Sequence, residues 1–244
     1  MSEGKVLLVA GASSDVGAAL IRKTGQQYET VFAHYRGSEE IINNLRKEIG
    51  ERIVPVHADF SDCASTEKMI SDIRNSGKSP DHIVLLSAPK AHNLQFSRIS
   101  WDSFRQEADI SLRSAVMILQ AFLPVMAKKK YGKVVFMLSS YVFGVPPKFQ
   151  STYVTVKYAL LGLMKSLAAE YAARGITVNA VSPEMMETRF LSELPDLIIE
   201  QSARNSPRGR NLSVEEAVPA IEFLLSSGSD AVTGQNLGVT GGAR

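Results

Sequence analysis

Short apolar runs alternate with longer amphipathic stretches along this chain. Runs rich in β-branched residues predict strands at residues 6–10, 30–35, 53–57, 83–87, 133–138, 177–182 and 237–239. Stretches with apolar residues at helical spacing predict helices at residues 16–26, 39–49, 64–75, 101–129, 151–174 and 214–226. Strands separated by helical segments indicate βαβ units with right-handed crossovers, and therefore a parallel sheet.

The strands themselves are apolar on both sides. The first one contains Val6-Leu7-Leu8-Val9, without the polar alternation of a strand that faces water on one side. Such strands suit a sheet that helices cover on both faces. A chain of 244 residues fits one α/β domain of this kind and leaves little room for a second. We therefore predict a single domain over residues 1–244, built on a doubly wound parallel sheet of about seven strands.

The stretch at 184–212 breaks this pattern. It carries two prolines, several charges and a Met-Met pair, and its periodicity is poor. Two interpretations fit it: an excursion over the surface, or a substrate lid, because long loops in compact domains often cover ligand sites. Its position after a strand end, where open α/β sheets bind ligands, favours the lid.

Composition narrows the class of protein. The 27 basic and 25 acidic residues give a net charge of +2, which does not favour nucleic-acid binding. Cys63 is the only cysteine, so no internal disulfide can form and a reducing compartment is expected. The apolar run at 6–10 is too short for a signal sequence or a membrane span, so we expect a cytoplasmic protein without a membrane partner. The four histidines lack metal-ligand spacing, and no metal is expected.

A turn of small residues follows the first strand. It reads Ala10-Gly11-Ala12-Ser13-Ser14-Asp15-Val16-Gly17 and leads into a predicted helix. Small residues let the backbone approach a pyrophosphate, whose charge the free amides and the helix dipole stabilise. The spacing is not that of the G-x-G-x-x-G fingerprint, and any tight strand-to-helix turn uses such residues. The place of the turn, between the first strand and the first helix, is what indicates a nucleotide site.

The end of the second strand bears on the choice of cofactor. A free ribose 2′-hydroxyl favours an Asp or Glu there, but the chain reads His34-Tyr35-Arg36-Gly37-Ser38 and has no carboxylate until Glu39. Arg36 could form a charge-assisted contact with a 2′-phosphate, or it could be an ordinary solvated arginine. The first interpretation predicts a preference for NADPH over NADH.

Candidate catalytic residues lie at the end of the fifth predicted strand and in the helix after it. The strand ends in Ser139-Ser140, and Tyr153 and Lys157 follow near the start of the helix, four residues apart and so on one face. An ammonium beside a phenol favours the phenolate, so we expect Lys157 to lower the pKa of Tyr153 and make it an acid/base. A Tyr-x-x-x-Lys pair is common by chance and gains weight from the strand-end serine and the turn.

Together these residues make the chain resemble the short-chain dehydrogenase/reductase family over essentially its whole length. The family's T-G-x-x-x-G-x-G turn is similar to residues 10–17, its Ser, Tyr and Lys match Ser140, Tyr153 and Lys157, and its usual ending is similar to residues 233–242. The resemblance implies a Rossmann-like oxidoreductase that transfers a hydride between a nicotinamide and a ketone or secondary alcohol, commonly as a homotetramer without a metal.

The resemblance also implies a role for each matched residue. Ser140 would hold the substrate oxygen, Tyr153 would give it a proton, and Lys157 would bind nicotinamide ribose hydroxyls while tuning Tyr153. Ser111 stands where many members place an asparagine that holds a proton-relay water, and it is the fourth catalytic candidate. The implied cofactor contacts are Gly11, Ser13, Ser14, Asp15, Val16, Gly17, Arg36, Asp59, Phe60, Ser87, Ala88, Tyr153, Lys157, Pro183, Met186 and Thr188.

Several positions depart from the family pattern. Asp15 replaces the middle glycine of the turn, Pro89 ends the Leu86-Ser87-Ala88-Pro89 that stands for the usual N-N-A-G, and Glu184 follows Pro183 where a glycine is usual. Glu184 would put a carboxylate at the mouth of the substrate site or turn it towards water. With Ser111, these departures keep open a second hypothesis, a cofactor-binding member with impaired catalysis that acts as a sensor or a subunit of a complex.

Within the family, the similarity is greatest to 3-oxoacyl-[acyl-carrier-protein] reductases of fatty acid biosynthesis, which implies an acyl-thioester substrate. A reductase that acts on another ketone is a second interpretation, whereas the chain length disfavours a sugar-nucleotide epimerase. The helix at 151–174 is apolar on more than one face, which favours an oligomer. Basic residues that match carrier-docking positions, but that also suit solvated helix ends, are Lys128, Lys129, Lys130 and Arg174.

Overall fold

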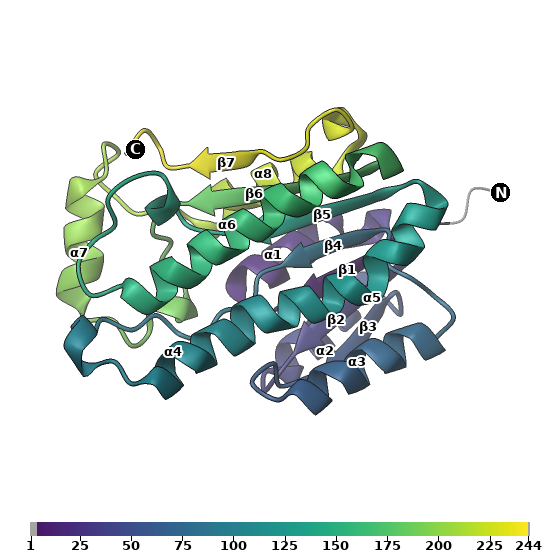
Figure 1. The fold of residues 1–244 in the computed structure, drawn as a ribbon, viewed down its shortest axis with the longest axis horizontal. Coiled ribbons are helices and arrows are strands. Elements are labelled where there is room, and N and C mark those ends of the chain that lie inside the picture. Colours follow the sequence, from purple (N-terminus) through teal and green to yellow (C-terminus); the bar gives the residue numbers. More distant parts are fainter. Residues whose placement is uncertain (1–3, 244) are drawn as a thin grey trace.

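The computed structural model describes residues 4–243, and its seven strands form one parallel sheet. The order across the sheet is β3-β2-β1-β4-β5-β6-β7 (Figure 1). Strands β2 and β3 extend the sheet to one side of β1 and the last four strands extend it to the other, so the switch point of the sheet lies between β1 and β4. The predicted doubly wound α/β fold is confirmed. The strands are β1 (Val6–Ala10), β2 (Thr30–Tyr35), β3 (Ile53–His57), β4 (His82–Leu85), β5 (Gly132–Met137), β6 (Ile176–Pro183) and β7 (Asn236–Val239).

Helices cover both faces of the sheet (Figure 1), as the apolar strands require. One face packs against α1 (Asp15–Thr24), α2 (Glu39–Ile49) and α8 (Val214–Leu225). The other face packs against α3 (Cys63–Asn75), α5 (Ser114–Lys129) and α6 (Ser151–Tyr171). The strand arrows all end on the side where α7 (Asp196–Asn205) lies, which makes that edge the place for a ligand.

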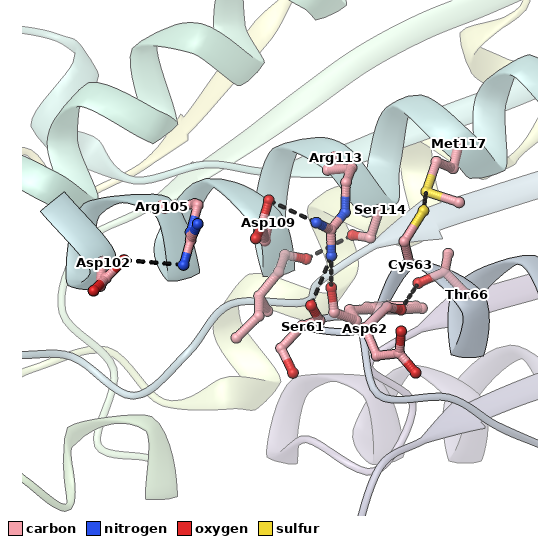
Figure 2. Close-up of polar contacts among 12 residues, drawn as sticks. Ser61, Asp62, Cys63, Thr66, Asp102, Arg105, Asp109, Arg113, Ser114 and Met117 are labelled. Carbon is pink, nitrogen blue, oxygen red and sulfur yellow. Dashed lines mark hydrogen bonds and ion pairs between the residues drawn. The ribbon is translucent and has the colours of Figure 1, made fainter.

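The prediction of one unbroken helix at 101–129 is wrong in one respect. The structure has α4 (Trp101–Ala108), a π-helical turn at Asp109–Arg113, and then α5. Figure 2 shows what holds this turn: Arg113 pairs with Asp109 at 2.8 Å and donates to the backbone oxygens of Phe60 (3.0 Å) and Ser61 (2.8 Å). The π turn is thus tied to the loop that follows β3.

The continuous stretch Trp101–Lys129 is long and apolar enough to cross a membrane by length and composition, but 56% of its apolar window is buried inside the protein. It packs in the hydrophobic core between the sheet and its neighbouring helices. A core helix of a soluble protein passes the same test, so the stretch indicates no span.

The segment at 184–212 contains more structure than its sequence predicts. It holds a short 3-10 turn at Arg189–Leu191 and the helix α7, and a small apolar cluster joins Leu191 and Leu194 of this segment to Ala91. Ala91 lies in the loop after β4, so the segment crosses from the end of β6 to the middle of the sheet edge.

Candidate active site

A cleft of about 1160 Å³ lies along the carboxyl ends of the strands. Its walls come from the turn after β1, the ends of β2 to β6, the start of α6 and the segment at 184–205. All the catalytic and cofactor-binding residues expected from the sequence line this cleft except Gly17 and Ser111. Residues far apart in the chain therefore meet where open α/β sheets bind their ligands.

The turn after β1 is shaped by glycine. Gly11 has a φ of +90°, where a side chain is strained, and an added Cβ would lie 3.3 Å from the backbone nitrogen of Ser87. Gly17 lies behind the turn, and a Cβ there would lie 2.4 Å from the backbone oxygen of Gly11. Ser14 caps α1 by accepting the amide of Gly17 at 3.1 Å. Gly17 thus lets the helix approach the strand, while Gly11 opens the cleft.

Ser87 provides a direct test of whether a dinucleotide suits this turn. Its hydroxyl oxygen is buried, lines the cleft beside Gly11, and has no hydrogen-bond partner among residues 4–243. An unpaired buried hydroxyl is costly unless a ligand or water satisfies it. With the N-terminus of α1 directed at the same space, a ribose and a pyrophosphate fit the residues present.

The buried side chain of His34 holds the turn after β1 in place. The amide of Gly11 donates to His34 Nδ1 at 2.9 Å, and His34 Nε2 lies 3.1 Å from the backbone oxygen of Ala58. Both contacts are satisfied only when Nε2 carries the proton and Nδ1 accepts. The ring stacks on Phe60 with 4.0 Å between centroids. Burial lowers the pKa of His34 to about 4, so the imidazole is neutral at physiological pH.

Two charged residues, Arg36 and Asp59, follow the ends of β2 and β3. Both line the cleft, and Arg36 is exposed to it. The pKa of Asp59 is lowered, first by a hydrogen bond from the side chain of Ser61 and to a smaller extent by the charge of Arg36. Oδ1 of Asp59 accepts both the amide and the hydroxyl of Ser61, and Arg36 places an exposed guanidinium at the same end of the cleft.

The segment at 184–205 is fastened across the cleft at two places. Arg189 binds Asp15 at 2.8 Å through Nε and donates to the backbone oxygen of Ser13 at 2.8 Å. At the other end, Glu193 pairs with Lys90 at 3.1 Å and lies 3.4 Å from His92. Asp15, which stands at the family's middle glycine, therefore has a definite structural use as an anchor for this segment.

Tyr153 and Lys157 lie together in the cleft, as their spacing predicts. Lys157 Nζ is 5.3 Å from the centre of the Tyr153 ring and donates to the backbone oxygen of Met137 at 2.8 Å. The ring of Tyr153 also contacts two aromatic rings, Tyr141 at 6.3 Å and Phe190 of the segment across the cleft at 5.8 Å. The ring of Tyr153 is thus flanked by two aromatic side chains, and the residue lines the cleft.

The serine bonded to Tyr153 is Ser139, one position before the expected Ser140. A hydrogen bond joins the side chains of Ser139 and Tyr153, and Ser139 Oγ also accepts the amide of Tyr141 at 3.3 Å. Ser139 is still extended, with φ −157° and ψ 152°, whereas Ser140 begins a 3-10 turn. Ser140 is buried and lines the same cleft.

The expected lowering of the Tyr153 pKa is not found. Burial is the largest influence and raises the pKa of the phenol above its usual value, while the hydrogen bond from Ser139 lowers it to a smaller extent. Lys157 directs its ammonium at the Met137 carbonyl, and burial lowers the pKa of Lys157 itself. In this state Tyr153 carries its proton, which is the form needed to protonate a substrate oxygen.

Ser111 lies behind the cleft and not in its wall. It is 4% exposed, in the π turn, and its Oγ is 3.5 Å from Oε1 of Glu107. Glu107 is 5% exposed and interacts electrostatically with Lys157. Glu107 was not among the residues expected at the site, although its helical spacing of four from Ser111 places the two on one face.

The remaining departures and basic residues are spread over the molecule. Glu184 lines the cleft and lies 3.5 Å from the hydroxyl of Ser206, and Pro89 lines the same cleft.

The basic residues of the carrier-docking hypothesis lie at the opposite edge of the sheet, where α5 leads into β5 and the chain enters β6. They are Lys128, Lys129, Lys130 and Arg174, of which Lys129 pairs with Asp81 at 2.8 Å.

This geometry defines a class of protein: a one-domain α/β oxidoreductase with a Ser-Tyr-Lys set beside a nucleotide turn. A family model described as Enoyl-(Acyl carrier protein) reductase matches residues 11–244. The chain belongs to the short-chain dehydrogenase/reductase family, whose members are oxidoreductases that bind a nicotinamide cofactor.

Individual relatives cover nearly the whole chain. It is 30% identical to 3-oxoacyl-[acyl-carrier-protein] reductase FabG of Salmonella typhimurium, over 98% of this chain and 97% of that protein. It is also 30% identical to the FabG of Staphylococcus aureus, over 99% of each. Among solved structures, a proposed NAD(P)-dependent gluconate 5-dehydrogenase from Beutenbergia cavernae, with NADP bound at low occupancy, superposes with a TM-score of 0.90 at 26% identity and covers 99% of this chain and 97% of that one.

Proposed function

We propose that this protein is an NADPH-dependent reductase of a ketone, working reversibly on the corresponding secondary alcohol. The observation that carries the proposal is the meeting of Ser139, Tyr153 and Lys157 in one cleft beside the Gly11 turn. A neutral phenol, a hydroxyl and a buried lysine together supply acid/base chemistry. A hydride-transfer reaction needs no more than this from the protein.

Each residue has a distinct task in the proposed reaction. The bound cofactor supplies the hydride. Ser139 orients the carbonyl oxygen, and Tyr153, which burial keeps protonated, gives that oxygen its proton as negative charge develops. Lys157 stabilises the resulting phenolate from within 5.3 Å of the ring. Phe190 and Tyr141 exclude water from the reacting atoms.

NADPH is proposed over NADH because of Arg36. Its guanidinium is the exposed cation at the end of β2, and the carboxylate of Asp59 is bonded to Ser61. The test is the ratio of kcat/KM for NADPH to kcat/KM for NADH in the wild type and in Arg36→Ala. We expect NADPH to be preferred and the substitution to reduce that preference by a factor of about 10 to 100 through loss of a charge-assisted contact. A wild type that prefers NADH would refute this part of the proposal.

The proposed substrates are acyl thioesters with a 3-oxo group, because the FabG relatives are named for that reaction. The segment at 184–212 would act as a lid, held by Asp15–Arg189 at one end and by Glu193 at the other. The basic residues at 128–130 and Arg174 face away from the cleft, so in a single chain they would not deliver a carrier-bound acyl group to Tyr153. The half-buried leucines of α6 favour a homo-oligomer, and a cytoplasmic enzyme is consistent with the FabG relatives.

A panel of 3-oxoacyl thioesters, small ketones and sugar ketones, with NADPH oxidation as the readout, tests the substrate class. Turnover of thioesters alone supports the 3-oxoacyl reductase, and turnover of another ketone class moves the proposal to that substrate. NADPH binding without turnover of any of them would favour the alternative, a cofactor-binding member with impaired catalysis. Pro89 and the absence of an asparagine at Ser111 are the features that support this alternative.

A further inference from the structure

Arg113 joins two segments that both contribute to the wall of the cleft (Figure 2). One is the loop after β3, from which Asp59 and Phe60 line the cleft. The other is the π turn at Asp109–Arg113, from which Ile110 lines it. Arg113 itself lies outside the cleft wall, so any effect that it has on a bound ligand passes through these neighbours.

The guanidinium of Arg113 uses a different nitrogen for each segment. Nη1 pairs with Oδ1 of Asp109 at 2.8 Å, and Nη2 donates to the backbone oxygens of Phe60 at 3.0 Å and Ser61 at 2.8 Å. The side chains of Arg113 and Asp109 are only 31% and 25% exposed, and hydrogen bonds from a charged donor are stronger than those between neutral groups. A planar guanidinium can hold three such acceptors at once, whereas a lysine ammonium is a point charge on a flexible stem.

The position of Phe60 matters for the nucleotide turn as well. The ring of Phe60 stacks on His34 with 4.0 Å between centroids, and His34 accepts the amide of Gly11 at 2.9 Å. Phe60 also shares an apolar cluster with Ile110 of the π turn. A shift of the loop backbone at Phe60 would therefore change the support of the Gly11 turn and the shape of the cleft wall together.

The strand order places this wall on one side of the Gly11 turn and the acid/base residues on the other. β3 lies at the edge of the sheet, two strands from β1, whereas Tyr153 follows β5 on the other side of β1. A dinucleotide binds across the switch point of such a sheet with its pyrophosphate at the first turn. With its nicotinamide beside Tyr153, its adenosine half lies towards β3 and the loop that Arg113 holds.

We propose that Arg113 is a positioning residue of the cofactor site, which holds the loop after β3 against the π turn and so shapes the part of the cleft that takes the adenosine half of the dinucleotide. The inference rests on the proposed function for the identity of the cofactor, and it does not depend on which ketone is reduced. Arg113 acts through the backbone of Phe60 and Ser61.

Separate binding of the two halves of the cofactor provides the first test. The probes are adenosine 2′,5′-bisphosphate, measured by calorimetry, and reduced nicotinamide mononucleotide, measured by its own fluorescence. In Arg113→Gln we expect the Kd of the bisphosphate to rise by about 5- to 50-fold, because the charge-assisted contacts are lost, and the Kd of the mononucleotide to stay within about two-fold of the wild type. Asp109→Asn, which leaves both carbonyl contacts possible, should raise the Kd of the bisphosphate less than Arg113→Gln.

Arg105→Gln is the matched control. Arg105 also pairs with an aspartate of its own helix, Asp102, at 2.9 Å, but it is exposed and lies outside the cleft wall (Figure 2). Its substitution removes the same charge from the neighbouring turns of the helix. We expect Arg105→Gln to bind both probes as the wild type does.

Cys63 reports on the same loop without any ligand and provides the second test. It is the only cysteine of the chain, lies two residues after Ser61 and is exposed, and its sulfur is 3.8 Å from that of Met117 on α5 (Figure 2). Release of the loop should free this thiol from α5, so Cys63 should react about 3- to 10-fold faster with an aromatic disulfide reagent in Arg113→Gln than in the wild type. A rate equal to that of the wild type would overturn the inference.

The outcomes separate this inference from the proposed function. A bisphosphate Kd in Arg113→Gln equal to that of the wild type would refute the inference and leave the reductase in place. An equal rise in the Kd of both probes would also refute it, because Arg113 would then have only a general role in the fold. A selective loss of the bisphosphate in a protein that reduces no ketone would refute the reductase and support the inference. If Arg113→Gln does not fold, Arg113→Lys decides the matter, because it keeps the charge without the fork and should show the same selective loss to a smaller extent.

Discussion

Lowering the pH should loosen the cofactor turn through a single residue, His34. The neutral ring accepts the amide of Gly11 at Nδ1 and donates to Ala58 at Nε2. Protonation would place a hydrogen on Nδ1, facing the hydrogen of the Gly11 amide, and the contact would become repulsive. The imidazolium would also be charged in a buried, largely apolar place beside Phe60.

The size of the effect follows from the difference between two pKa values. An unfolded chain protonates this histidine near 6.5, whereas the folded protein does so only near a pKa of about 4. The unfolded state therefore binds more protons between these values, and the contribution of His34 to stability is complete above pH 6.5 and is lost as the pH falls to 4. Linkage gives a loss of about 2 kcal/mol at pH 5 and about 3 kcal/mol at pH 4.

Urea unfolding at pH 7, 6 and 5 measures this loss. Other groups contribute to acid destabilisation, including His82, whose pKa burial lowers to about 3, so the comparison is between variants. The stability of His34→Gln should fall by about 2 kcal/mol less between pH 7 and pH 5 than that of the wild type. His92→Gln, a substitution at an exposed histidine, should follow the wild type. Equal pH dependence in His34→Gln and the wild type would show that His34 is not a buried neutral imidazole.

Three further predictions concern the cleft. Ser139→Ala should lower kcat by about 100-fold, and Ser140→Ala by much less, as measured by steady-state NADPH oxidation; the reverse order would assign the role to Ser140. Gly17→Ala should destabilise the protein by about 2 kcal/mol or more in thermal or urea unfolding, because its Cβ would lie 2.4 Å from a backbone oxygen of the turn; a neutral result would mean that the turn moves freely. Arg189→Gln should speed cofactor release several-fold in stopped-flow measurements by freeing the segment from Asp15, and an unchanged rate would contradict the lid.

The sheet and the nucleotide turn could be predicted from the sequence because both depend on local patterns. Apolar runs separated by amphipathic stretches determine a parallel sheet, and Gly11 and Gly17 mark places where a side chain does not fit. Tyr153 and Lys157 were predictable as a pair because helical spacing alone puts them on one face.

Other features depend on tertiary contacts and could not be read from local patterns. The choice between Ser139 and Ser140 depends on which way the chain faces as it leaves β5, and two adjacent serines look alike in sequence. The sign of the Tyr153 pKa shift depends on burial, which outweighs the opposing effect of the hydrogen bond with Ser139. Glu107 is one of 25 acidic residues, and only the packing of α4 against α6 distinguishes it.

The π turn at Asp109–Arg113 is a further example. Its residues continue a helical pattern without Gly or Pro, so the sequence predicts an unbroken helix. The contacts from Arg113 to Phe60 and Ser61 join segments more than fifty residues apart, and no local pattern encodes them. Local sequence patterns predict the helices and strands, whereas the position of each side chain at the site depends on tertiary contacts.

Proton donation by Tyr153 is the centre of this account, and Tyr153→Phe tests it most directly. The substitution removes one oxygen and leaves the ring contacts with Tyr141 and Phe190 possible. With the best ketone from the panel, single-turnover NADPH oxidation should slow by at least about 100-fold, while the Kd for NADPH stays within about two-fold of the wild type. Oxidation at the wild-type rate would contradict the proposed chemistry.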